Sequence, residues 1–273
     1  MRTELQAYNE LIMSSFIDIG PLQKPVIQLD PDVDASKVNI YPDNCRSRRV
    51  FSRSDWQMNG RYYGGWWQRV SDDWRSKIFI DDNPTIEIDF KGLHVAMLYA
   101  QAGQDMLIDP YNIYPIEYQS LPPILVRKFV KRLVLTAINA KEKSSAYRAF
   151  REGFPAGNKG KKLSNKKLDV LLEAFIEHNP PMKDLMFTDQ GIRLMYLDSQ
   201  ITTLVHRHFT KQGVPVLSVH DSYIINYMKL AELRQVMSKA SSEVVGRALP
   251  SSIKLPDMEE RGGPRFQTSL QPI

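Results

Sequence analysis

The chain has 273 residues, of which 42% are hydrophobic and 25% charged, and its formal net charge is +5 at pH 7. These proportions are those of an ordinary globular protein and exclude a fibrous or low-complexity chain. The single cysteine, Cys45, excludes an intrachain disulfide framework and a cysteine-rich metal site. No apolar run reaches the ~18 residues of a membrane span, and the first twenty residues do not resemble a signal peptide. We therefore expect a cytoplasmic protein with no membrane partner, whose mild basic excess suits a polyanionic one.

The first half of the chain alternates between irregular and regular segments. A short helix is expected at 4–16, followed by a connector rich in proline and aspartate. Residues 45–78 form a basic and aromatic block, with eight Lys or Arg, three acids and all four tryptophans. Strict alternation of apolar and polar residues predicts a strand at 85–90. Helical periodicity follows at 93–102 and, after a stretch punctuated by prolines, at 124–140.

The second half begins with a strongly basic segment at 141–167, which has nine Lys or Arg against two Glu and is interpreted as a helix end and a loop. Helices are expected at 168–177 and 189–212. Two short apolar strands at 214–227, separated by polar residues, predict a hairpin. A last helix is expected near 231–249. Strand, helices, hairpin and helix in this order indicate an α+β fold and not a regular βαβ alternation.

Two aspartates, far apart in the sequence, are candidates for metal chemistry. Asp89 ends the predicted strand at 85–90 on its polar face, and Asp221 lies at the tip of the predicted hairpin. Taken alone, each has a commoner explanation, since an aspartate often faces water at a sheet edge or occupies a turn. Together, two acids on adjacent strands suit Mg²⁺, which prefers oxygen ligands and takes one or two carboxylates with substrate phosphates. A pair of such ions stabilises both the attacking and the leaving oxygen in phosphoryl transfer.

The helix expected at 124–140 carries a ladder of positive charge. Arg127 and Lys131 are four residues apart, so they lie one turn above each other on one face. Such a ladder suits a triphosphate, because Arg brings a fork of donors and Lys a point charge. Since Lys128 and Arg132 are also basic, a solvated helix face explains this spacing as well.

The basic and aromatic block offers a surface for nucleic acid, where cations contact phosphates and rings stack on bases. Its densest part is residues 60–68, which include Arg61 and two adjacent tryptophans. Trp66 and Trp67 are more readily explained as core residues, because tryptophan is usually largely buried. The arginines have no such explanation.

These pieces, in this order, resemble the polymerase domain of family A DNA polymerases, the bacterial polymerase I type. Residues 89–94, Asp-Phe-Lys-Gly-Leu-His, resemble motif A, whose aspartate binds both metals. The helix with Arg127, Lys131 and Asn139 resembles motif B, whose Arg and Lys grip the incoming triphosphate. Residues 219–222, Val-His-Asp-Ser, resemble motif C. Within the family, the chain is most like the short polymerase-like proteins of plasmids, phages and integrated elements.

Two further segments are similar to parts of the family that contact nucleic acid. Arg61 and the following Gln68 resemble the segment that touches the primer and the minor groove. Arg193 and Gln200, on one predicted helix, resemble the Arg and Gln that contact template and primer. With His220 of motif C, these residues are the expected DNA contacts.

The resemblance implies a right-hand polymerase fold of palm and fingers, with a reduced or absent thumb. Residues 1–45 are then an N-terminal arm, 46–253 the palm and fingers core, and 254–273 a flexible tail. The fingers, at about 110–185, are inserted in the palm. Because only about 45 residues precede the basic and aromatic block, we expect no proofreading exonuclease here, and an accessory protein completing the DNA clamp is a further expectation.

The resemblance also assigns roles to residues. Asp89 and Asp221 are expected to be catalytic and to bind two Mg²⁺ ions, replaceable by Mn²⁺, with Phe90 beside them at the metals. Lys131 is expected to bind the triphosphate and to protonate the departing pyrophosphate. The nucleotide-binding residues are Arg127, Lys131, His94 and Asn139.

Three departures from the family pattern bear on specificity. Ser222 replaces the glutamate that usually follows the motif C aspartate, so metal binding depends on the two aspartates. His94 stands where the family has a glutamate that selects deoxynucleotides, and Asn139 replaces a tyrosine. Both changes favour tolerance of ribonucleotides.

The expected activity is template-directed nucleotidyl transfer from deoxynucleoside triphosphates onto a DNA primer-template, serving replication or repair on a mobile element. Two alternatives remain. The first is a primase or RNA-synthesising polymerase that accepts ribonucleotides. The second is a non-catalytic protein that binds single-stranded DNA and has kept the fold while losing the chemistry.

Overall fold

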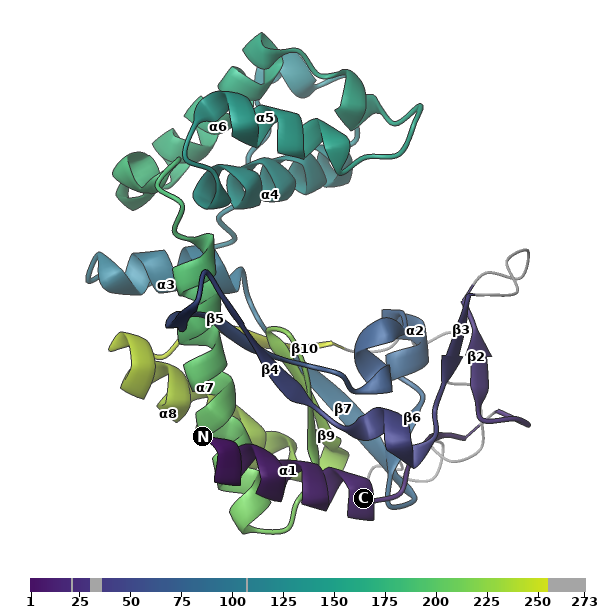
Figure 1. The fold of residues 1–273 in the computed structure, drawn as a ribbon. Coiled ribbons are helices and arrows are strands. Elements are labelled where there is room, and N and C mark those ends of the chain that lie inside the picture. Colours follow the sequence, from purple (N-terminus) through teal and green to yellow (C-terminus); the bar gives the residue numbers. More distant parts are fainter. Residues whose placement is uncertain (21, 30–35, 107, 255–273) are drawn as a thin grey trace, which may run out of the picture.

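A six-stranded antiparallel sheet, with the strand order β1-β6-β7-β9-β8 and with β10 paired to β7, occupies the lower part of the molecule in Figure 1. The structure is a computed structural model that describes residues 1–273 except 21, 30–35, 107 and 255–273. The strands of this sheet are β1 (Ile17–Ile19), β6 (Ile78–Ile80), β7 (Asn83–Phe90), β8 (Val216–Val219), β9 (Ser222–Asn226) and β10 (Ser251–Lys254).

Strand β7 lies inside the sheet, because both of its sides are paired near its end. Strand β9 pairs with it from Thr85 to Asp89. On the other side, β6 pairs with its first residues and β10 with its last four. The strand expected at 85–90 is confirmed, and because its side chains alternate between faces, Ile88 and Phe90 are buried in the core. Asp89 therefore lies on an inner strand and not at a sheet edge.

The expected hairpin is confirmed as β8 and β9. A two-residue turn of His220 and Asp221 connects the strands, since Val219 pairs directly with Ser222. His220 has a φ of 54°. A positive φ in a two-residue loop matches the right-handed twist of the flanking strands. The turn thus fixes the position of Asp221 at the end of the hairpin.

The two faces of the sheet carry two separate hydrophobic clusters. On one face, Ile88 and Phe90 pack with residues of α3 (Leu93–Gln101), α7 (Gly191–Lys211) and α8 (Leu230–Val245). On the other face, Leu217 and Ile224 pack with Trp66, Trp67 and residues of the first helix. The two tryptophans are 1% and 0% exposed, so their interpretation as core residues is confirmed.

The segment predicted as an N-terminal arm packs against this second face. Helix α1 (Arg2–Ser14) buries Tyr8 and Ile12, and the Tyr8 hydroxyl donates to the carbonyl of Val216 at 3.0 Å. Strand β1 extends the sheet by pairing with β6. Strands β2 (Val26–Gln28) and β3 (Lys37–Asn39) form a separate antiparallel ribbon.

A second ribbon runs along helix α7 and carries much of the basic and aromatic block. It consists of β4 (Arg48–Ser52) and β5 (Asp55–Tyr63). The Tyr62 hydroxyl lies 2.9 Å from the Thr203 hydroxyl of α7. The short helix α2 (Asp72–Arg75) also belongs to this block and leads into β6.

Helices α4 (Pro123–Asn139), α5 (Lys143–Glu152) and α6 (Asn165–His178) form the upper part of Figure 1. The segment 141–167, interpreted from the sequence as a helix end and a loop, contains a separate helix, because α5 occupies its first half. Ala146, Tyr147 and Phe150 give α5 a buried face at helical spacing. The many charged residues of this segment outweighed the three apolar ones in the sequence pattern, so the helix was not predicted.

The other predicted helices are confirmed to within a few residues. They correspond to α1, α3, α4, α6, α7 and α8. The division into palm and fingers stays a prediction. Of the tail expected at 254–273, Lys254 ends β10, and 255–273 lie outside the described residues. No helix of the described residues is long and apolar enough to cross a membrane.

Candidate active site

The fold brings Asp89 and Asp221 together. Asp89 pairs with Ser222 across β7 and β9, so Asp221 is the next residue beyond that pair. The amide of Phe90 donates to the carbonyl of Asp221 at 3.2 Å, which ties the hairpin turn to the end of β7. Two residues from opposite halves of the sequence thus share one end of the sheet, as the sequence predicted. Phe90 itself is buried and packs edge-on against Tyr223.

The electrostatics of Asp89 reflect this pairing. Burial, and then the nearby charge of Asp221, raise the pKa of its carboxyl to about 7, although the charges of Lys254 and Lys131 act to lower it. Its Oδ1 atom is buried without a hydrogen-bond partner among the described residues. A buried carboxylate oxygen without a donor is costly, and a bound cation is one way to satisfy it. The site is therefore suited to a cation.

This pKa leads to a prediction about stability. Ionised Asp89 is less favourable in the folded protein, where its pKa is about 7, than in the unfolded chain near 3.8. The contribution of Asp89 to the free energy of unfolding is therefore greatest below pH 4 and is lost as the pH rises through 7. Asp89→Asn should therefore raise the free energy of unfolding by about 1–3 kcal/mol at pH 8 and change it little at pH 4. Urea titrations at both pH values measure the difference. The exposed Asp184→Asn variant serves as the control, and an equal gain at both pH values would contradict the prediction.

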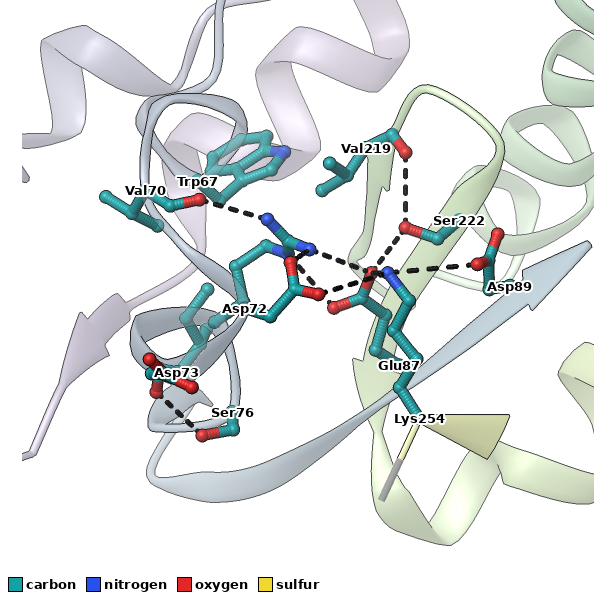
Figure 2. Close-up of polar contacts among 12 residues, drawn as sticks. Trp67, Val70, Asp72, Asp73, Ser76, Glu87, Asp89, Val219, Ser222 and Lys254 are labelled. Atoms are coloured by element: carbon teal, nitrogen blue, oxygen red, sulfur yellow. Dashed lines mark hydrogen bonds and ion pairs between the residues drawn. The ribbon is translucent and has the colours of Figure 1, made fainter. Parts of the chain in front are cut away.

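A third carboxylate, Glu87, lies beside the pair, and sequence analysis assigned it no role. It is 8% exposed, and Arg75 donates to it from Nε at 3.0 Å. Ser222, which stands in place of the expected motif C glutamate, donates its hydroxyl to Glu87 Oε1 at 2.5 Å. Lys254 contacts the same oxygen at 2.9 Å (Figure 2). Because of these partners the pKa of Glu87 is lowered in spite of its burial. The carboxylate is thus fully engaged within the protein.

Arg61 and His94 lie in a buried polar cluster that the sequence did not indicate. Arg61 Nε contacts Asp198 Oδ2 of α7 at 2.5 Å, and the two side chains are 15% and 1% exposed. Arg61 Nη2 lies 3.3 Å from His94 Nε2. Burial, together with Arg61, lowers the pKa of His94 to about 3, so the ring is neutral. Both side chains therefore have internal partners, and the predicted DNA contact of Arg61 and nucleotide contact of His94 stay predictions.

Two other predicted ligand contacts are also engaged internally. The Gln68 amide donates to the carbonyls of Tyr62 and Ser218 at 3.1 and 2.9 Å and accepts from the amide of Gly64 at 3.3 Å. These three bonds make Gln68 a brace between the aromatic block and β8, and its predicted contact with DNA stays a prediction. Asn139 donates to the carbonyl of Leu135 at 2.6 Å and lies against Gly191, where α7 begins.

The predicted cationic ladder lies on α4 as expected. Arg127 Nε contacts Asp109 Oδ2 at 2.6 Å, so its charge is already paired. Lys131 is exposed, and its charge lowers the pKa of both Asp89 and Asp109. Lys131 of the upper helices therefore lies within electrostatic range of Asp89.

Tyr111 connects the ladder to the acids, and sequence analysis missed it. The Arg127 guanidinium lies 5.8 Å from the centre of its ring. Burial raises the pKa of Tyr111, and Asp109 and Asp221 raise it further, so its hydroxyl stays protonated. A Cβ on Gly92 would lie 3.4 Å from this ring, and the φ of Gly92 is 54°. Glycine is thus favoured in the turn after β7 both for space and for conformation. The only sequence signal was an aspartate, a proline and a tyrosine in a row.

The remaining predicted DNA contacts are spread along the molecule. Arg193, near the start of α7, is exposed and lines a cavity of about 470 Å³ with Arg53 and Asp189. Gln200 lies farther along the same helix. His220 is exposed at the hairpin turn and packs edge-on against Tyr63, with 5.8 Å between the centres of the two rings. Their contacts with DNA stay predictions.

Comparisons with known proteins add a weak likeness. No family model and no curated protein sequence matches the chain. Among solved structures, it is similar to the "POL domain of Pol1 from M. smegmatis complex with DNA primer-template and dNTP", with a TM-score of 0.41 and 10% identity. The match covers 74% of this chain and 44% of that one, so the chain spans less than half of that polymerase domain. A likeness this distant assigns neither a family nor an activity, and the class of protein is therefore inferred from the site.

Proposed function

We propose that the protein is a nucleotidyltransferase that extends a nucleic acid strand from nucleoside triphosphates, in the manner of a minimal DNA polymerase. One observation carries the proposal. Two aspartates from distant parts of the sequence meet at the end of one sheet, and a buried oxygen of Asp89 has no partner among the described residues. An exposed lysine of the upper helices acts on the same carboxylate.

The donor set fits Mg²⁺ or Mn²⁺. Asp89 and Asp221 supply hard oxygen ligands, and the unpartnered Oδ1 of Asp89 is available to a cation. Bound there, divalent ions would supply neutralisation of a triphosphate and activation of an attacking hydroxyl. The described residues contain no group of three or more His, Cys, Asp or Glu that could hold a metal alone. Such a two-carboxylate site depends on the phosphates of the substrate to complete it, which favours a triphosphate reaction.

The cationic residues of α4 have separate roles in this proposal. Lys131, exposed beside the acids, binds the triphosphate and donates a proton to the departing pyrophosphate. Arg127 is held by Asp109 and Tyr111, and it binds a phosphate by exchanging the Asp109 carboxylate for it. Asp109 thus keeps the guanidinium in position before the substrate arrives.

Lys131 provides a prediction of its own. Replacing Lys131 with methionine removes a charge that interacts with the triphosphate in both the ground state and the transition state. We expect kcat/KM for the nucleotide to fall by about 10²-fold, with part of the loss in KM. Steady-state extension at varied nucleotide concentration measures both parameters. Lys128→Met removes a neighbouring charge from the same helix and should change kcat/KM less than about 3-fold. Equal losses in the two variants would contradict the assigned role.

The proposal is tested by extension assays with the unmodified protein. A labelled primer on a DNA template, and the same template without primer, are each supplied with deoxynucleotides or ribonucleotides and with Mg²⁺ or Mn²⁺. Extension of the primer with deoxynucleotides supports a DNA polymerase. Synthesis on the unprimed template from ribonucleotides would instead favour a primase. DNA binding without metal-dependent incorporation under every condition would overturn the proposal in favour of a binding protein.

A further inference from the structure

The last described strand places a lysine beside the paired aspartates. Strand β10 pairs antiparallel with β7, with Ser252 opposite Asp89 and Lys254 opposite Glu87. Directly paired residues of adjacent strands share a face of the sheet. Lys254 therefore projects on the same face as the two acids of β7, and neither the motifs nor the resemblance pointed to it.

Lys254 contacts three carboxylates at once. Its Nζ lies 2.9 Å from Glu87 Oε1, 3.9 Å from Asp89 Oδ2 and 3.9 Å from Asp72 Oδ2. Figure 2 shows its amino group between Glu87 and Asp89. The Lys254 side chain is 34% exposed, so its ammonium group is partly accessible to solvent.

The other cation of this cluster, Arg75, is engaged by groups other than Asp89. Arg75 binds both oxygens of Glu87, contacts Asp72 and donates to the carbonyl of Val70 at 3.0 Å. Among the described residues, Lys254 is the ion-pair partner of Asp89 within 4 Å. It therefore offsets the repulsion between Asp89 and Asp221 when no other cation is present.

We propose that the ammonium group of Lys254 acts as an internal counter-ion of Asp89 with which a divalent metal ion must compete, so that strand β10 sets the metal affinity of the site. The inference depends on the proposed function, because it takes Asp89 as a metal ligand. Two cations beside one half-buried carboxylate repel each other, and this repulsion weakens the binding of the second. Glu87 retains the lysine after displacement, since it already forms the shorter contact. The Lys254 ammonium group thus keeps the affinity of the site for divalent metal ions low until the phosphates of a substrate add their negative charge.

The test measures Mn²⁺ binding by the loss of the electron paramagnetic resonance signal of the free ion, with the full chain and without nucleotide. Lys254→Met should tighten Mn²⁺ binding by about 10-fold, whereas Lys254→Arg, which keeps the charge, should stay within about 2-fold of the parent protein. Lys91→Met removes an exposed charge close to the end of β7 and should also stay within about 2-fold. Asp89→Asn combined with Lys254→Met should abolish the tightened site.

The outcomes separate this inference from the proposed function. Binding by the parent protein that is unchanged or weaker in Lys254→Met overturns the inference and leaves the function standing. Absence of Mn²⁺ binding in all variants also overturns the inference, whereas the proposed function is tested separately by the extension assays. Tightening that survives Asp89→Asn, or that Lys91→Met reproduces, also overturns the inference. Lys254→Gln provides a second neutral variant with a donor for Glu87. If circular dichroism shows that neither neutral variant folds, Lys254 is a structural residue and the inference fails.

Discussion

Asparagine in place of Asp89 or Asp221 is expected to reduce nucleotide incorporation by about 10²–10³-fold or more. Each substitution keeps the shape of the side chain and removes the negative charge that holds a cation. Because Asp89 and Asp221 act on the same ions, the double variant should lose little more than either single one. Single-turnover extension of a primed template, in which binding and chemistry are separated, measures the loss.

The variants must fold for this result to be informative. Asp89→Asn is expected to be at least as stable as the parent protein, because the buried charge of this residue opposes folding above pH 7. Loss of activity with unchanged or increased stability therefore identifies a functional residue. Asp184→Asn, at an exposed position of the chain, should keep full activity. Full activity in both site variants would remove the basis of the proposed function.

Breaking the buried pair of Arg61 and Asp198 is expected to have the largest effect on stability. Asp198→Leu leaves the Arg61 guanidinium buried without its carboxylate, and Arg61→Met leaves Asp198 without its cation. Each should lower the free energy of unfolding by about 3–5 kcal/mol. Arg61→Met should be the milder change, because burial already raises the pKa of Asp198 to about 6 and the carboxyl takes up a proton readily.

The double variant tests whether the cost arises from the stranded charge. With Arg61→Met and Asp198→Leu combined, no charge remains buried, so the loss should be well below the sum of the single losses. Urea unfolding of all four proteins gives the coupling free energy. The Arg53–Asp189 pair, whose arginine is 48% exposed, provides the control, and Arg53→Met should cost about 1 kcal/mol or less. A similar small cost at Arg61 would show that the buried pair does not stabilise the fold.

The sequence was most informative where a pattern follows from backbone geometry. Period-2 alternation located β7, and the spacing of apolar residues located α4 and α7, because regular backbones repeat every two or 3.6 residues. Two short apolar strands around His220 and Asp221 predicted the hairpin. The same reasoning failed for α5, where a stripe of only three buried residues was outweighed by the surrounding charge.

The sequence by itself therefore determined β7, the hairpin of β8 and β9 and six of the described helices, together with the two aspartates at the ends of their strands. Only the tertiary structure decided which charges share a site. Glu87, Asp198, Tyr111 and Lys254 lie in no motif, and Arg61, Gln68 and His94 have internal partners that no motif indicated. The physical reason is that a side chain's charge and availability depend on burial and on ion-pair partners distant in the sequence, such as Lys254 for Asp89. Local patterns carry no information about such partners.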